Sequence, residues 1–330
     1  MPLRTAISMV VAALSLVVFP LIVFPLVVFP SAVLAQSFPV KPIRMIVPFA
    51  PGGPADALAR VIAPKFGERI GQPVIIESRP GGSGNVGADH VLKSSPDGYT
   101  LLYATPGMVT NPFFVKGSPD PRDFSAIVRF TVSGTVLIGS NGFAPNTLTD
   151  VIAAIRAKPG AVSCASSGAL PTVGCELLRS YAKTDLINVN YKGNAPAMLA
   201  VQSGEVNLLF DPLSSSINPI RAGKVKVIAT LNKTRGGPLL PDLPAAAEVY
   251  PDFWFDGWTG ALGPGNMPRD VVLRMNREFN AATSSPEVSK LFTSLGLVVV
   301  NDTPESLAET IRNDLLKYGK VTADAGIKPE

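Results

Sequence analysis

The hydrophobic and polar positions of this 330-residue chain follow two periods in turn. Short apolar runs, as expected for buried strands, alternate with stretches of 3.6-residue apolar period, which indicate amphipathic helices. The predicted strands are residues 45–47, 74–76, 99–103, 136–138, 162–165, 187–189, 206–210 and 225–229. The predicted helices are residues 56–70, 86–94, 148–157, 176–183, 196–203 and 217–222. This alternation is typical of parallel sheets covered by helices on both faces.

The pattern changes after residue 231. Residues 232–265 are rich in proline and glycine and are interpreted as a connection between domains. Helices are then predicted at 269–283 and 287–295, followed by a strand at 297–300. A last helix is expected to begin after Thr303, a favourable N-cap followed by proline at the first helical position. Its apolar stripe is expected to pack into the core and consists of Leu307, Ile311, Leu315 and Tyr318.

The first 35 residues are typical of a secretory signal peptide. Arg4 precedes an uncharged apolar stretch, and small residues end it at Ala35. The stretch is also long enough for an uncleaved membrane anchor, but its repeated prolines would interrupt such a helix. No cysteine follows the cleavage site, which argues against a lipoprotein anchor. We therefore expect cleavage and a periplasmic location, with enough chain left for two domains.

Charge and composition exclude several function classes. The net charge of +4 falls to +3 without Arg4, and the basic residues form no long run, so no nucleic-acid partner is expected. His90 is the only histidine, which leaves too few ligands for a zinc site, and we predict no metal and no cofactor. No Gly-x-Ser-x-Gly motif or other catalytic arrangement is present, so no catalytic residue is predicted. Cys164 and Cys175 could pair in an oxidising compartment or remain buried thiols, and the sequence leaves both open.

Two glycine-rich loops carry the strongest chemical signal. They are Pro48–Asp56 and Arg79–Gly87, and each lies between a predicted strand and a predicted helix. Glycine lets the backbone approach a ligand closely, and the N-terminus of the following helix favours an anion. Because the ends of parallel strands meet at one edge of a sheet, both loops are expected at the ligand-binding edge. A third loop, Ser166–Gly168, could bind the other end of a ligand or form an ordinary turn.

A dinucleotide site is the alternative for the second loop. Gly82, Gly84 and Gly87 form a G-x-G-x-x-G pattern between a strand and a helix. The acidic residue of that fingerprint should end the next strand, but Asp97 lies in the turn before it. Nicotinamide cofactors are also scarce outside the cytoplasm. We therefore favour a small anion over a dinucleotide.

A longer set of motifs resembles the Bug family, the extracytoplasmic solute receptors of tripartite tricarboxylate transporters. The resemblance covers the chain after the signal peptide. It rests on residues 39–60, 71–74, 79–88, 96–102, 111–112, 191–193, 204–206, 221–224 and 240–244, and on Trp258.

The resemblance implies an α/β, two-domain periplasmic binding protein fold (type II-like), in which each domain is a sheet flanked by helices and the ligand cleft lies between them. Domain 1 would hold residues 37–138 plus 255–330, and domain 2 residues 139–254. The implied function is capture of a small organic carboxylate for delivery to the membrane permease subunits of such a transporter. We expect a monomer.

The resemblance also implies ligand contacts. One carboxylate would lie between the first two glycine loops, partly through water, at Phe49, Gly52, Gly53, Ser83, Gly84 and Asn85. Thr105 would add a hydroxyl, and Ser166 and Ser167 would reach the distal end of the ligand. Asp56 matches a family acid that either caps its helix or touches the ligand. Asp211 would favour a ligand that carries a donor such as an amine, or else serve as a cap or hinge residue.

The third loop departs from the family pattern at residues 169–176, where the usual His-Leu is absent and the segment is shorter. Leu170 and Val173 are expected to make the distal pocket more apolar, which would favour a monocarboxylate or an aromatic acid. Two alternative functions remain: a carboxylate-sensing receptor that docks on a signalling partner, and a secreted hydrolase.

Overall fold

The computed structural model describes residues 38–237 and 239–329. The predicted signal peptide lies outside this range. Within it, no helix combines the length and apolar character that crossing a membrane requires.

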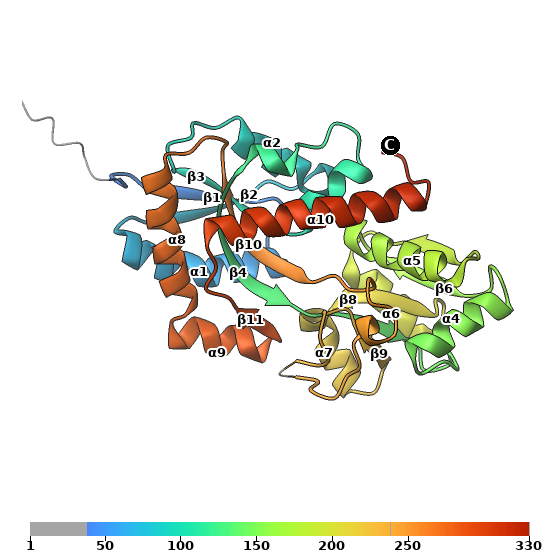
Figure 1. Ribbon diagram of the computed structural model, residues 1–330. Helices are drawn as coiled ribbons and strands as arrows, with labels where there is room; N and C mark the ends of the chain where they lie inside the picture. The colour runs from blue at the N-terminus through green and yellow to red at the C-terminus, as the bar shows by residue number, and fades with distance from the viewer. Residues whose placement is uncertain (1–37, 238, 330) are drawn as a thin grey trace, which may run out of the picture. The chain divides into compact units, whose positions relative to one another are not determined.

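The first sheet, sheet A, has six strands in the order β11-β4-β10-β3-β1-β2 (Figure 1). Its strands are β1 (Ile43–Val47), β2 (Val74–Ser78), β3 (Thr100–Ala104), β4 (Ser125–Ser133), β10 (Gly257–Gly263) and β11 (Leu297–Val299). Strand β1 pairs in parallel with β2 and β3, whereas β10 pairs antiparallel with both β3 and β4. Strand β11 is antiparallel to β4. Sheet A is therefore mixed.

The second sheet, sheet B, has five strands in the order β7-β6-β8-β5-β9. Its strands are β5 (Thr135–Gly139), β6 (Ser163–Ser166), β7 (Ile187–Asn190), β8 (Leu208–Pro212) and β9 (Lys226–Thr230). Strand β6 is parallel to β7 and β8, and β5 is antiparallel to β8 and β9. All of its strands come from one continuous stretch of the chain.

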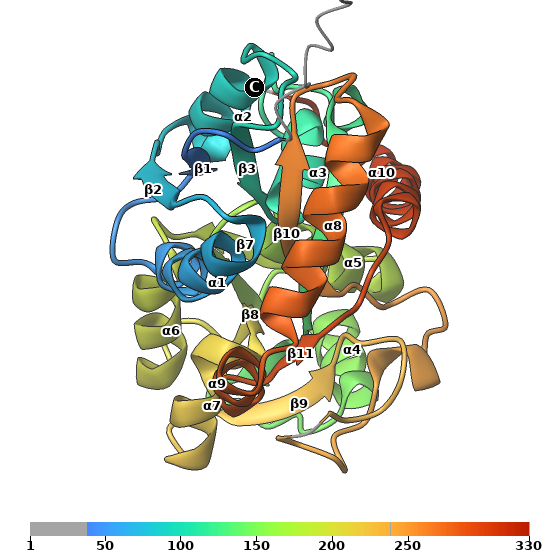
Figure 2. The same cartoon turned by 90° about the vertical axis from the view of Figure 1, so that its left-hand side faces the viewer.

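Helices cover both faces of both sheets. The longer ones are α1 (Pro54–Ile70), α2 (Asn85–Leu92), α4 (Leu148–Ala157), α5 (Ala169–Ala182), α6 (Asn194–Ser203), α7 (Leu213–Arg221), α8 (Arg269–Thr283), α9 (Pro286–Ser294) and α10 (Pro304–Asp324). Figure 2 shows α1 and α8 on one face of sheet A, where the rings of Phe66 and Phe279 stack with centroids 3.5 Å apart. Helices α2 and α10 cover the opposite face.

Alternation along the strands explains this layering. In β1, Met45 and Val47 pack toward α1 and α8, and Ile46 packs toward α2 and α10. In sheet B, Leu137 joins the core under α4 and α5, and Ile138 joins the core under α6 and α7. Successive side chains of a strand point to opposite faces, so each strand contributes to two cores.

The chain passes between the sheets twice, from β4 to β5 and from β9 back to β10. We call the junction of the two sheets at these crossings the seam. Strand β4 ends at Ser133, and β5 begins at Thr135 after a single glycine. Residues 231–237 and 239–256 lie on the return, and Phe255 donates its backbone N–H to the carbonyl of Leu231. Helix α10 fastens the end of this return and the start of β10: Lys317 donates to the carbonyl of Trp254, and the indole of Trp258 in β10 donates to Asp314.

Strand register places the carboxyl ends of the parallel strands at this seam. Ala104, the last residue of β3, pairs with Gly260, and β10 begins three residues earlier at Gly257, opposite Ser133. In sheet B, Pro212 at the end of β8 pairs with Thr135 at the start of β5. The loops that follow β1, β2 and β3 therefore leave sheet A on the same side as those that follow β6 and β8 leave sheet B.

The sequence predicted most of the helices and the parallel strands. Helices α4 and α8 have the predicted bounds, and the Thr303 side chain accepts the backbone N–H of Ser306 as an N-cap. The prediction of parallel sheets is wrong for both sheets. In sheet A, β10 was not predicted and runs antiparallel to β3 and β4, and in sheet B the predicted strand β5 runs antiparallel to β8 and β9. In β10 the pattern is interrupted by glycines at 257, 260 and 263, which leave few side chains to show alternation.

Candidate ligand-binding site

The first glycine loop follows β1 and is held by Asp56 at the start of α1. Gly52 has a φ of 78° and donates its backbone N–H to Asp56 Oδ2 at 3.0 Å. Arg60 Nε donates to the same oxygen at 2.9 Å, and Ser78 at the end of β2 donates to Oδ1 at 3.4 Å. The hydrogen bond from Arg60, helped by the N–H of Gly52, lowers the pKa of Asp56. Asp56 therefore joins the first loop to the end of the neighbouring strand.

The second glycine loop follows β2 and folds with a run of left-handed residues. Gly82, Ser83 and Gly84 have φ values of 53°, 56° and 98° and form a single 3-10 turn before α2. At Gly87 an added Cβ would lie 2.9 Å from the Cβ of Pro48 in the first loop. Only a glycine at 87 leaves room for this approach, so the two loops lie side by side.

Asn111 braces the second loop from below. Its Nδ2 donates to the carbonyl of Ser83 and to Oδ1 of Asn85, each at 2.9 Å. Asn85 Nδ2 in turn donates to the hydroxyl of Ser118 at 2.8 Å. Asn111 is buried. The sequence places it in a family motif, but it was not predicted as a site residue. Its bracing role depends on contacts across more than twenty residues, which the sequence pattern does not display.

The other predicted residues of this edge lie around these loops. Ser83 and Gly52 are exposed, Gly84 is buried, and Phe49, Gly53, Asn85 and Thr105 are half-buried. Thr105 follows β3, next to the short helix α3 (Gly107–Thr110). Helix α3 packs close to α5, which belongs to the sheet B side of the seam. The structure thus brings the predicted residues of the first three strands together on sheet A.

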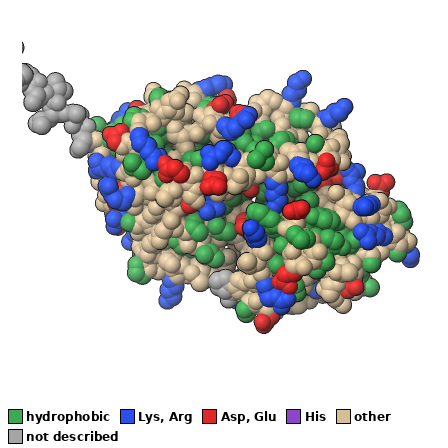
Figure 3. Space-filling model, viewed as in Figure 1, with side chains coloured by type: hydrophobic (Ala, Val, Ile, Leu, Met, Phe, Trp, Pro, Cys, Tyr) green, Lys and Arg blue, Asp and Glu red, His purple; other side chains and the backbone are tan. Residues whose placement is uncertain are grey.

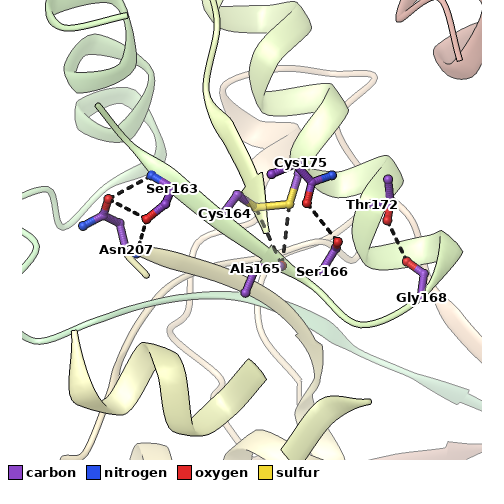
Figure 4. The surroundings of a disulfide bond; sticks show 9 residues. Ser163, Cys164, Ala165, Ser166, Gly168, Thr172, Cys175 and Asn207 are labelled. Carbon is purple, nitrogen blue, oxygen red and sulfur yellow. Dashed lines mark hydrogen bonds between the residues drawn. A yellow bond between two sulfur atoms is a disulfide. The ribbon is translucent and has the colours of Figure 1, made fainter. Parts of the chain in front are cut away.

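Across the seam, a disulfide fixes the third loop. Cys164 in β6 is bonded to Cys175 in α5, at a sequence separation of 11 (Figure 4). The ring that this bond closes contains Ser166, Ser167 and Gly168. Ser166 is buried and donates its hydroxyl to Asn188 Oδ1 at 2.8 Å. Of the two states that the sequence left open for these cysteines, the structure has the paired one.

Ser167 belongs to a chain of hydrogen bonds that ends in a buried carboxylate. Its hydroxyl donates to Asn194 Oδ1 at 2.9 Å, and Asn194 Nδ2 donates to Asp211 Oδ1. Ser215 and Ser216 both donate to Asp211 Oδ2 at 2.6 Å. Asp211 is 0 % exposed, and burial raises its pKa to about 6 despite these donors.

Two expectations about the distal pocket change with this geometry. Val173 is 0 % exposed and packs in the core with Cys175 and Leu178, so its predicted contribution to an apolar pocket wall is wrong. Leu170 packs against the same core. The error arose because residues 169–175 were expected to form a loop, whereas they are the first half of α5. Asp211 has no exposed surface in this structure, and its neighbours Asn194 and Ser167 are the groups that reach the seam.

Metal and charge features are unremarkable over the described ranges. Residues 38–237 and 239–329 contain no cluster of acidic, histidine and cysteine side chains that could hold a metal ion.

The pKa of His90 is lowered, mainly by burial and then by nearby Arg79 and Arg44. On the face shown in Figure 3, basic and acidic side chains are interspersed and form no continuous basic patch.

The fold and the seam define a class: a two-lobe solute-binding protein, with loops from both sheets converging on one seam. Residues 58–327 match the model of the tripartite tricarboxylate transporter family receptor. The chain belongs to this family, as its motifs suggested.

Relatives and solved structures agree with this assignment. A protein from the tcbD-tcbE intergenic region of Pseudomonas sp. strain P51 is 33% identical over 88% of each chain. Protein BugT of Bordetella pertussis is 30% identical over 90% of this chain and 93% of its own. The structure of periplasmic binding protein BugD is similar with a TM-score of 0.76 and 28% identity, over 89% of this chain and all of that one.

Two further similar structures from Rhodopseudomonas palustris contain ligands. Rpa4515 with adipate has a TM-score of 0.77 and 28% identity, over 89% of this chain and 100% of its own. MatC with bound malate has a TM-score of 0.75 and 29% identity, over 86% of this chain and 100% of its own. The predicted fold class is confirmed by these similarities, and the family and its structural neighbours are solute-binding receptors.

Proposed function

We propose that this chain is a periplasmic receptor that captures a small organic carboxylate at the seam and presents it to the membrane subunits of a tripartite tricarboxylate transporter. The ligand carboxylate lies against the first two glycine loops, beside Ser83 and Thr105. The observation that carries the proposal is the contact of these loops at Gly87 and Pro48, because it concentrates backbone N–H groups and a helix N-terminus at one point. The ligands of Rpa4515 and MatC support a carboxylate.

Binding without chemistry is part of the proposal. Apart from Phe49 and the buried Asp211, the site residues are glycines, hydroxyls and amides. The hydrogen bonds described above pair none of the hydroxyls of Ser83, Thr105 and Ser167 directly with a carboxylate or histidine. We place one lobe at residues 38–133 plus 255–329 and the other at 135–254, because β5 (Thr135–Gly139) belongs to sheet B and the predicted boundary at 138/139 would divide it. The lobes are joined at the seam and close on the ligand by a hinge. The chain acts as a monomer after removal of its signal peptide.

Thermal unfolding against a panel of organic acids tests the proposal. The exported protein is unfolded and refolded to remove carried ligand before the acids are added. A ligand that binds only the folded state raises the free energy of unfolding by mass action, by about 2.7 kcal/mol at a hundredfold excess over Kd, and so raises the midpoint temperature. Ser83→Ala and Thr105→Ala are expected to weaken binding about tenfold each, since each removes a hydrogen bond to a charged group.

Ser294→Ala is the matched control, because this exposed hydroxyl on α9 bonds only the carbonyl of Leu291. It should leave the shifts unchanged. A panel of mono-, di- and tricarboxylates that produces no shift at all would contradict the proposed function.

A further inference from the structure

The hydrogen-bond chain Ser167–Asn194–Asp211 has a fixed direction. Asp211 is fully buried, and three donors converge on its two oxygens: Asn194 Nδ2 and the hydroxyls of Ser215 and Ser216. A carboxylate only accepts hydrogen bonds, so the amide of Asn194 must turn its nitrogen toward Asp211. The amide oxygen of Asn194 then faces Ser167.

This direction determines what Ser167 can offer a ligand. The amide oxygen of Asn194 accepts only, so Ser167 must donate its single hydroxyl hydrogen to it. The distance from Ser167 Oγ to Asn194 Oδ1 is 2.9 Å. The remaining capacity of the Ser167 oxygen is its lone pairs. Ser166 is buried, and its hydroxyl hydrogen lies on Asn188 Oδ1 at 2.8 Å. Both serines of the third loop have therefore no hydrogen left to donate to a ligand.

Ser167 is also the member of the chain that a ligand can reach. Ser167 and Asn194 are both half-buried, whereas Ser166 and Asp211 are buried, and Ser167 is the end of the chain that lies farthest from the carboxylate. The disulfide ring and Asn194, the first residue of α6, hold it at the carboxyl end of β6. A group that meets the Ser167 oxygen must bring its own hydrogen, because an unpaired carboxylate oxygen against these lone pairs would be repelled.

We infer that the distal subsite selects a carboxylate whose far end carries a hydrogen-bond donor, a hydroxyl or an ammonium group, over one with a second carboxylate. The inference rests on the proposed function and adds the chemical class of its ligand. Asp211 acts as a positioning residue, since its charge orients Asn194 and through it Ser167. The rival ligand is a diacid whose second carboxylate lies on the N–H groups that begin α5 after Gly168.

Calorimetric titration with acids of matched length separates these ligands. The probes are hexanoate, 6-hydroxyhexanoate, 6-aminohexanoate and adipate, with the corresponding four- and five-carbon sets, added to the exported protein after ligand removal. The hydroxy or amino acid is expected to bind about tenfold or more tighter than the diacid of the same length. Ser167→Ala should lower the affinity for the hydroxy and amino acids to that of the plain monoacid.

Asp211→Asn tests the relay itself. An amide at 211 lets Asn194 reverse, which frees the hydrogen of Ser167, so the preference over the diacid should fall to about threefold or less. Ser215→Ala is the matched control, because it removes one donor to the same carboxylate and leaves the charge in place. The control should keep the wild-type preference. Ser167→Ala keeps the test valid if Asp211→Asn fails to fold.

Two results would overturn the inference. One is a wild-type protein that prefers the diacid: loss of that preference with Ser167→Ala would show that Ser167 donates, and its persistence would show that the second carboxylate lies on the N–H groups that begin α5. The other is equal binding of all four acids of each length, which would show that the distal subsite does not distinguish the groups at the far end of the ligand. Both leave the carboxylate receptor intact, whereas failure of every acid to bind would remove the proposed function as well.

Discussion

The two sides of the seam are built from different materials. On sheet A, the proposed site is mainly backbone, with the hydroxyls of Ser83 and Thr105 beside it. Gly52, Gly82 and Gly84 have positive φ, and the loops pack so closely that a Cβ at Gly87 would clash with Pro48. On sheet B, the site consists of side chains, held by a disulfide and by the buried carboxylate of Asp211. Backbone N–H groups suit any carboxylate, whereas an ordered set of hydroxyls and amides distinguishes one partner from another. Sheet A would therefore supply affinity for the class, and sheet B the choice within it.

The largest effect is expected from Gly87→Val, which disturbs the contact between the two glycine loops on the sheet A side. Its side chain would meet Pro48 and, at 3.1 Å, the carbonyl of Arg79, neither of which can move without shifting a loop. We expect binding of every acid to fall more than about hundredfold and the free energy of unfolding to fall by about 1–3 kcal/mol. Calorimetry and chemical denaturation measure the two quantities.

Gly142→Ala is the control for that variant, because nothing lies within 4 Å of its added Cβ. It should bind normally. Equal affinity of Gly87→Val and wild type would show that the contact between the loops is not needed for binding. The assignment of carboxylate affinity to the sheet A side of the seam would then be wrong.

The disulfide allows the side-chain edge to be loosened alone. Replacing both Cys164 and Cys175 by alanine should lower the free energy of unfolding by about 2–3 kcal/mol, since the bond closes a short ring in the unfolded chain. A reducing agent should produce a similar loss in the wild type and none in the double variant. If denaturation curves of oxidised and reduced wild type coincide, the bond does not stabilise this edge.

A smaller effect should appear in the pH dependence of the free energy of unfolding. Asp211 on the sheet B side and Asp56 on the sheet A side should change it in opposite directions. The pKa of Asp211 is raised to about 6 by burial, so the folded protein binds its proton before the unfolded chain does. The free energy of unfolding should therefore gain on the order of 2 kcal/mol from this group as pH falls from about 7 to 4. Asp211→Asn should lack that gain.

Asp56 should behave in the opposite way. Its pKa is lowered, chiefly by the hydrogen bond from Arg60, so the stability that it contributes is present above the ordinary carboxyl pKa and is lost as pH falls below it. Asp56→Asn should therefore be less stable than wild type at pH 7 and still so at pH 5. Denaturation curves at a series of pH values check both variants, and parallel pH profiles for the two would contradict the assignment.

The sequence was most informative where the site depends on neighbouring residues. Gly52, Gly84 and Gly87 were recognised because strand, glycine loop and helix follow one another directly along the chain. The structure adds partners that lie far apart, such as Asn111 with Ser83, or Ser167 with Asn194 and Asp211. No local pattern encodes such contacts. Val173 shows the reverse error, since an apolar residue assigned to a loop was a helix residue facing the core.

The same limit explains the strands that were not predicted. Strand β10 carries three glycines, and β4 pairs with β10 and β11 across more than a hundred residues of chain. Parallel strands followed directly by their helices leave a repeating pattern, but the antiparallel additions do not. The two-sheet architecture was therefore predictable mainly through its family motifs.

The order of strands along the chain also bears on how the protein folds. Sheet B uses an unbroken segment from Thr135 to Thr230, whereas sheet A cannot pair β3 with β10 or β4 with β11 until residues 257–299 arrive. Contacts that are close in sequence close their loops at a smaller entropic cost and form earlier. Sheet B should thus acquire protection from hydrogen exchange first, and the glycine loops should reach their final positions only when the segment from Gly257 onward joins sheet A. The surface proposed to hold the carboxylate would then be completed last.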